Sequence, residues 1–188
     1  VDARAHGDSE GAKIGMGWPE RRDIAGWIRL ILSWDPDARI ILHGVSMGAA
    51  TVLMASGETL PENVKAVIAD CGYTSEWDEF IWEAETLHIP WFPVLNAASL
   101  LSKLRDGYDF KQASALEQVK KSDIPTLFIH GTADELVPYK MLGELFSAAA
   151  CEKESLTVEG AGHALSSSVE PEMYWSTVGE FVEKYIGS

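Results

Sequence analysis

Short apolar segments alternate along this chain with longer segments of mixed polarity. Each apolar segment runs for four to eight residues with few polar positions. This pattern is typical of strands that are buried on both faces of a parallel sheet. It predicts four strands, at residues 38–43, 64–71, 125–130 and 155–158.

The longer segments repeat apolar residues at helical spacing. Residues 18–33 show this clearly, with Ile24, Trp27, Ile28 and Ile31 on one face. The same spacing predicts further helices over residues 47–57, 75–87, 94–105, 139–150 and 172–186. Strands that alternate with helices predict an α/β fold, with a mostly parallel sheet and helices on both of its faces.

One connection between predicted strands is much longer than an ordinary crossover. Residues 73–121 separate the second strand from the third, whereas most connections in such folds are short. Within a single domain spanning residues 1–188, we interpret this segment as a helical cap inserted above the strand ends. Plain helix packing explains any single aromatic residue there better than ligand contact does, but the set suits an apolar site. The candidate pocket residues are Trp77, Phe80, Trp91 and Phe92.

Composition and charge exclude several classes of protein. The chain has 188 residues, 46% of them hydrophobic, and a formal net charge of −14, so one domain with a real core is the default. The acidic balance argues against binding nucleic acid or an anionic membrane through bulk charge. No apolar run reaches the length of a membrane span, and no signal peptide is visible. These features favour a cytoplasmic protein, although the chain begins at Val1 and an upstream targeting or membrane segment stays an open alternative.

The most specific motif is Gly-Val-Ser-Met-Gly at residues 44–48. It follows a predicted buried strand and opens a predicted helix, the context in which G-x-S-x-G forms a nucleophile elbow. The strained turn lifts Ser46 above the sheet, and we expect Gly44 and Gly48 to remove Cβ atoms that would clash. Ser46 is therefore the candidate nucleophile. The Met47 backbone N–H, at the positive end of the helix, is a candidate oxyanion donor.

A serine nucleophile needs a general base and an acid that orients the base. Of the five histidines, His163 lies in a glycine-rich loop between the last predicted strand and the last helix. Loops after the carboxyl ends of parallel strands form the ligand sites of open α/β sheets, so His163 is the candidate base. His43 and His130 end predicted strands, and we expect structural roles for them. His6 lies in the N-terminal loop and His88 in the predicted cap.

The candidate acid is Asp134, in the loop after the third predicted strand. Its alternative role is that of a turn-forming or helix-capping residue. The chain order Ser46, Asp134, His163 is the order found in folds with this type of elbow, and it favours Asp134. Asp70, at the end of the second strand, is the runner-up. Glu135 is disfavoured because it should point away from its neighbour.

Four motifs together make the chain resemble the α/β-hydrolase superfamily, in its serine esterase and lipase branch. They appear in the family's order, at residues 2–9, 43–48, 130–138 and 162–163. The first is similar to the family's loop after its fourth strand, with Ala5 in place of the usual glycine, and that loop is mainly architectural. The resemblance implies a catalytic triad made of Ser46, His163 and Asp134.

The resemblance also implies that part of the family's fold lies outside this sequence. The family has three strands before the segment at Val1, and the loop after the third strand supplies the second oxyanion donor. Without them the strand at 38–43 would present an exposed apolar edge, an aggregation hazard. We therefore expect a lost N-terminal segment or a second chain to complete the sheet. Because one missing oxyanion donor costs about 10²–10³ in rate, this chain alone is expected to be a poor enzyme.

The expected activity is hydrolysis of a carboxylic ester with an apolar group, without a metal or an organic cofactor. The same triad serves thioesterases, lysophospholipases and peptidases, so the leaving group stays open. A dehalogenase is disfavoured, because that chemistry on this fold uses an aspartate where Ser46 stands. From another class, a non-catalytic relative that binds a ligand or partner, or an inert fragment, is the alternative. Cys71 and Cys151 fall in different predicted elements, and we expect free thiols.

Overall fold

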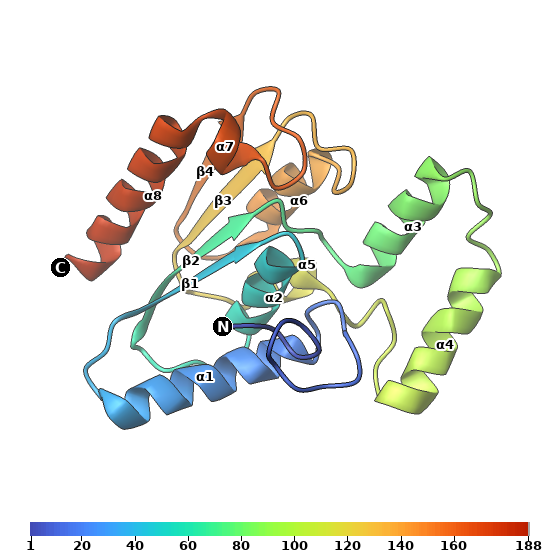
Figure 1. Cartoon of the computed structure of the whole chain (residues 1–188), viewed down its shortest axis with the longest axis horizontal. Helices are drawn as coiled ribbons and strands as arrows, with labels where there is room; N and C mark the ends of the chain where they lie inside the picture. Colours follow the sequence, from blue (N-terminus) through green and yellow to red (C-terminus); the bar gives the residue numbers. More distant parts are fainter. Residues whose placement is uncertain (188) are drawn as a thin grey trace.

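A four-stranded parallel sheet forms the centre of the computed structural model, which describes residues 1–187 (Figure 1). Its strands are β1 (Ile40–Val45), β2 (Val64–Asp70), β3 (Thr126–Gly131) and β4 (Lys153–Val158). Neighbouring strands pair in parallel in the order β1-β2-β3-β4. The predicted α/β fold with a parallel sheet is therefore confirmed.

Helices connect and flank these strands within the described residues. They are α1 (Glu20–Trp34), α2 (Met47–Ser56), α3 (Glu76–Thr86), α4 (Val94–Asp106), α5 (Ala115–Val119), α6 (Lys140–Ala148), α7 (Ser166–Val169) and α8 (Pro171–Ile186). The sequence did not predict α5 and α7, because segments of five and four residues are too short to show a helical period. A span of apolar helix long enough to cross a bilayer is not found in residues 1–187.

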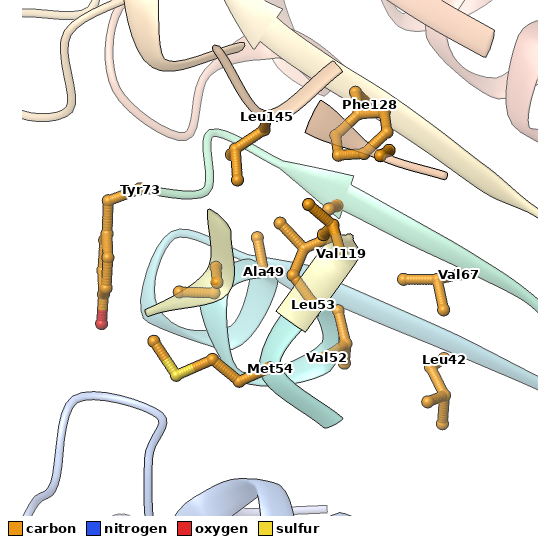
Figure 2. Packing of buried hydrophobic residues seen from close by; sticks show 14 of the residues in the cluster. Leu42, Ala49, Val52, Leu53, Met54, Val67, Tyr73, Val119, Phe128 and Leu145 are labelled. Atoms are coloured by element: carbon orange, nitrogen blue, oxygen red, sulfur yellow. The ribbon is translucent and has the colours of Figure 1, made fainter. Parts of the chain in front are cut away.

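Helices cover both faces of the sheet (Figure 1). On one face, α2, α5 and α6 surround the larger hydrophobic cluster, which includes Leu53 of α2 and Val67 and Phe128 of the sheet (Figure 2). On the other face, α8 packs through residues such as Phe181 against alternate strand positions such as Ile68. Helix α2 is buried from its third residue onward. This burial explains why α2 is apolar all round rather than amphipathic.

Strand β1 lies at one edge of the sheet, where β2 is its single strand partner among the described residues. His43 and Val45 near its carboxyl end are exposed. A groove of about 1000 Å³ runs beside this edge, between β1, α2, α1 and the N-terminal loop. The described chain therefore leaves β1 with an open edge, as the sequence led us to expect.

Helices α3 and α4 stand away from the sheet, on the side toward which its strands point (Figure 1). Neither helix packs extensively on another helix or strand of the described chain. Individual side chains of α3 connect this helix to other parts of the chain. The Trp82 indole N–H donates to the backbone oxygen of Glu135 at 3.0 Å, and the rings of Phe80 and Phe110 meet edge-on with centroids 5.0 Å apart.

The first turns of α3 carry two carboxyl groups into the protein. Glu76 and Glu79 are buried, and one oxygen of each has no hydrogen-bond partner among the described residues. Burial, reinforced by nearby carboxylates, raises the pKa of both groups to about 8. Both carboxyls are therefore largely protonated at neutral pH in the folded protein.

Replacing Glu76 or Glu79 by glutamine is expected to stabilise the protein at high pH. A carboxyl with a raised folded pKa binds its proton more tightly when folded, so its contribution to stability is lost as pH rises from about 4.5 toward 8. Glutamine never ionises. Urea unfolding should show a gain on the order of 1–2 kcal/mol at pH 8 and little gain near pH 4. The exposed Glu85→Gln is the control, and an equal gain at both pH values would contradict the assignment.

Candidate active site

Ser46 occupies the turn from β1 to α2. Its backbone has φ 56° and ψ −120°, a region in which a residue other than glycine is strained. Its N–H donates to the backbone oxygen of Asp70 at 2.9 Å, which fixes the turn against the end of β2. The turn therefore has the strained geometry of a nucleophile elbow.

A close approach of two backbone segments requires glycine at position 44. A Cβ atom at Gly44 would lie 2.2 Å from the carbonyl oxygen of Gly48. The same expectation for Gly48 was wrong. A Cβ atom there would meet no atom within 4 Å other than those of its chain neighbours and its own helix backbone, because Gly48 borders the groove beside β1.

Gly44→Ala is expected to destabilise the protein by about 3 kcal/mol, because either the elbow or the start of α2 must shift to admit the methyl group. Gly48→Ala is the matched control, since it adds the same methyl group in open space and should change the free energy of unfolding by less than about 1 kcal/mol. Chemical denaturation of both variants measures the difference. Equal effects would show that the approach at Gly44 does not constrain the fold.

His163 reaches Ser46 from the loop between β4 and α7. Its Nε2 lies 2.8 Å from Ser46 Oγ, and its Nδ1 lies 2.9 Å from Asp134 Oδ2. Because an ionised carboxylate can only accept, Nδ1 carries the proton and Nε2 is free to accept the serine hydroxyl proton. The His163 side chain is 22% exposed and that of Asp134 is fully buried. A substrate can therefore reach the imidazole while the carboxylate stays shielded from water.

Donors surround the carboxylate of Asp134. Its Oδ1 accepts the backbone N–H groups of Leu136 at 3.0 Å and Val137 at 2.9 Å, while Oδ2 faces His163 and His130. Burial alone would raise the pKa of Asp134, but the hydrogen bonds from His130, His163 and Val137 outweigh it and hold the pKa below its ordinary value. Asp134 is therefore ionised at neutral pH and able to balance an imidazolium.

His130, at the end of β3, has a partner that the sequence did not reveal. Its Nε2 lies 3.0 Å from the backbone oxygen of Val137 and 3.2 Å from Asp134 Oδ2. Since a carbonyl can only accept, Nε2 carries the proton. The ring therefore ties the Asp134 carboxylate to its own loop. The position of His130, four residues before Asp134, was the one signal in the sequence for this contact. The sequence does not show which way the ring points.

Neither alternative acid contacts His163. The Asp70 carboxylate accepts the Ser166 hydroxyl at 3.1 Å, and burial raises its pKa. Glu135 is exposed. Among the acids considered from the sequence, Asp134 is the one that the structure brings within hydrogen-bond distance of the imidazole.

Cys71, directly after β2, lies beside the same side chains. Its Sγ and ligand atoms of Asp134 and His163 lie within 4.8 Å of one another, the one such grouping among the described residues that could hold a metal ion. Burial, followed by the charge of Asp70, raises the pKa of the thiol to about 12, so the thiolate that a metal ion needs is disfavoured. Both cysteines are free thiols, as expected. The arrangement therefore suits proton transfer between His163 and Ser46 better than metal binding.

The four candidate pocket residues pack mainly on their neighbours. The ring centroids of Trp77 and Trp91 are 6.1 Å apart, those of Trp91 and Phe92 are 6.2 Å apart, and Phe92 is mostly exposed. None of these four side chains lines the groove beside β1 or the smaller hollow between α3 and α6. Their part in binding a substrate stays a prediction.

The fold and the site together define a class of protein. A strained serine between strand and helix, with a histidine and a buried carboxylate at hydrogen-bond distance, is the arrangement of a serine hydrolase of the α/β-hydrolase type. The model of the prolyl oligopeptidase family, Peptidase_S9, matches residues 31–188. The chain belongs to this family.

Two curated relatives, both described as uncharacterized proteins, match most of the chain. YqkD of Bacillus subtilis (strain 168) is 29% identical over 184 residues, which cover 97% of this chain and 60% of YqkD. Rv2307c of Mycobacterium tuberculosis (strain ATCC 25618 / H37Rv) is 29% identical over 163 residues, which cover 86% of this chain and 51% of the relative. The chain thus spans about half to three-fifths of the length of these relatives.

Solved structures share the fold. The Pyrococcus furiosus esterase Pf2001 superposes with a TM-score of 0.76 at 24% identity, covering 98% of this chain and 69% of the esterase. The Pyrococcus horikoshii acylaminoacyl peptidase superposes with a TM-score of 0.69 at 19% identity, covering 90% of this chain and 28% of the peptidase. At these identities the likeness establishes the α/β-hydrolase fold, and function has to be argued from the site.

Proposed function

We propose that this protein hydrolyses carboxylic esters through an acyl-enzyme on Ser46. The observation that carries the proposal is the hydrogen-bonded series in which Ser46 Oγ lies 2.8 Å from His163 Nε2, and Nδ1 of the same ring lies 2.9 Å from Asp134 Oδ2. A serine hydroxyl is a weak nucleophile unless an adjacent base accepts its proton. Here the base is already oriented and its partner is ionised.

The reaction follows from these contacts. His163 Nε2 accepts the Ser46 proton as Oγ attacks the acyl carbonyl, and Asp134 stabilises the resulting imidazolium. His163 then donates that proton to the leaving alcohol. Water, activated by the same nitrogen, attacks the acyl-enzyme and releases the acid. Asp134 stays ionised throughout, because its hydrogen bonds hold its pKa low.

The Met47 N–H supplies one oxyanion donor. It directly follows Ser46 at the first residue of α2, where backbone N–H groups have no intrahelical acceptor. We propose that the second donor comes from a segment that fills the groove beside β1, either elsewhere in the same protein or on a second chain. The open β1 edge and the groove that Met47 and Gly48 line support this assignment. So does the greater length of the relatives.

Peptide hydrolysis is the second candidate function. Membership of the prolyl oligopeptidase family and the likeness to an acylaminoacyl peptidase favour it. Thioesters and lysophospholipids suit the same triad. The aromatic side chains of residues 73–121 favour an apolar acyl or alcohol group, and hence the ester.

Hydrolysis of a substrate panel by the protein tests the proposal. The panel contains chromogenic esters of increasing acyl length, a thioester, a lysophospholipid and a peptide anilide. We expect the highest kcat/KM for an ester with a medium or long acyl chain, and a kcat lower by about 10⁴–10⁶-fold in Ser46→Ala. A preference for the peptide anilide would establish the second candidate. Thermal stabilisation by these compounds without turnover of any would indicate a non-catalytic binding protein.

A further inference from the structure

An apolar surface covers the outer side of α4 and the connection between α3 and α4. Seven large hydrophobic side chains there are each 53–77% exposed: Leu87, Ile89, Phe92, Val94, Leu100, Leu101 and Leu104. We name these residues the α3–α4 apolar surface. Scattered exposed leucines are ordinary, but a set of this size on one short segment marks an interaction site.

Helix α4 presents its apolar stripe outward. Leu101 and Leu104 belong to this stripe and are exposed, whereas Ser99 and Ser102 face the protein. The Ser99 hydroxyl accepts the N–H of Phe110 at 3.1 Å. The Ser102 hydroxyl donates to the backbone oxygen of residue 108 at 3.0 Å. An ordinary surface helix has the opposite arrangement. Because hydrogen bonds fix the polar face inward, the outward leucines are a property of the fold.

Charge distinguishes this segment from the rest of the chain. Residues 86–105 contain no aspartate or glutamate, although the whole chain has a formal net charge of −14. The charged side chains in this segment are Lys103 and Arg105. The bulk charge argues against an anionic membrane, but the local charge of this segment does not repel lipid phosphates.

The position of the surface also favours a lipid. The connection between α3 and α4 carries Trp91 and Phe92, and tryptophan is enriched where a protein meets the headgroup level of a bilayer. Both helices stand on the side toward which the strands point, the side of the loops that carry Ser46 and His163 (Figure 1). An apolar molecule held in a bilayer against this surface would therefore lie on the same side of the protein as the serine.

We infer that the α3–α4 apolar surface docks on the surface of a lipid bilayer. A second copy of this chain could also cover the leucines. However, a symmetric contact would bring like-charged segments and two acidic bodies together. The inference goes beyond the proposed function and does not depend on it, since Ser46→Ala should dock equally well.

Sedimentation with vesicles tests the inference. The whole purified protein is mixed with phosphatidylcholine vesicles, with and without phosphatidylglycerol. We expect it to bind, and the double variant Leu101→Glu/Leu104→Glu to bind at least about tenfold more weakly, since it loses two leucines that docking would bury in the bilayer and gains acidic charge. Trp34→Ser is the matched control, because it removes a 73% exposed hydrophobic side chain from α1 and should bind as the wild type does.

A local probe excludes binding through any other segment. An environment-sensitive fluorophore on Leu87→Cys should shift its emission to the blue on adding vesicles, and the same label on Trp34→Cys should not. Equal shifts at both positions, or no shift at Leu87→Cys, would overturn the inference. A protein that does not bind vesicles but forms a dimer, which the double glutamate variant disrupts, would also overturn the inference. The α3–α4 apolar surface would then bind a second copy of the chain.

Discussion

Ser46→Ala is expected to lower kcat for ester hydrolysis by about 10⁴–10⁶-fold, the largest loss of any single substitution in this chain. Removal of the nucleophile from a triad typically leaves only the catalysis that substrate binding and the oxyanion donors provide. Folding should be unaffected, since alanine accepts the same φ of 56° with the same Cβ. Steady-state kinetics and covalent labelling by a fluorophosphonate probe measure the effect.

Ser168→Ala is the matched control for this variant. Ser168 is exposed and lies five residues from His163, so it shares the neighbourhood but not the contacts of Ser46. It should keep full activity and full labelling. Labelling that persists in Ser46→Ala would sink the nucleophile assignment and leave the acyl-enzyme mechanism without a site.

Asp134→Asn is expected to lower kcat by about 10⁴-fold. The reason lies in the hydrogen bonds of the carboxylate. Oδ1 accepts the N–H groups of Leu136 and Val137, so the amide oxygen must take that position. The amide NH₂ then replaces Oδ2 and donates to His163 Nδ1. The ring proton moves to Nε2, and His163 can no longer accept the proton of Ser46.

The same variant has a pH signature in stability. Because the folded pKa of Asp134 is lowered, its ionised form contributes stability above its unfolded pKa, and that contribution is lost as pH falls through the folded pKa. The stability difference between wild type and Asp134→Asn should therefore be greatest near neutral pH and shrink under strongly acidic conditions. Urea unfolding across this range measures it, with the exposed Glu135→Gln as the control. A difference that does not change with pH would show that the charge of Asp134 does not stabilise the folded protein.

The sequence predicted the sheet well where burial dominates and less well at strand ends. Residues 38–43 were predicted as the first strand, whereas β1 begins at Ile40 and continues to Val45, whose partner is Asp70 of β2. At β4 the charged Lys153 and Glu154 hid the strand's start. An edge strand tolerates such residues, so a pattern based on burial cannot detect them.

Some residues of the candidate site could be identified from local sequence, and others could not. Ser46 was identified from contiguous residues, because a strand, a glycine-flanked turn and a helix are all local. His163 and Asp134 were chosen from loop position and chain order. The contact between His163 and Ser46 joins residues 117 positions apart, and the contact between His163 and Asp134 joins residues 29 positions apart. Such contacts depend on how β1, β3 and β4 are placed within the sheet. No local sequence pattern specifies that placement.

The sequence by itself determined the parallel α/β architecture and the strained elbow at Ser46. Both follow from short-range causes, namely the alternation of apolar segments and the need for glycine at position 44. Only the tertiary structure decided that His130 supports Asp134, that Gly48 faces open space and that the leucines of α4 point outward. Each of these depends on which way a side chain faces once distant elements have packed, and the order of residues along the chain does not fix that direction.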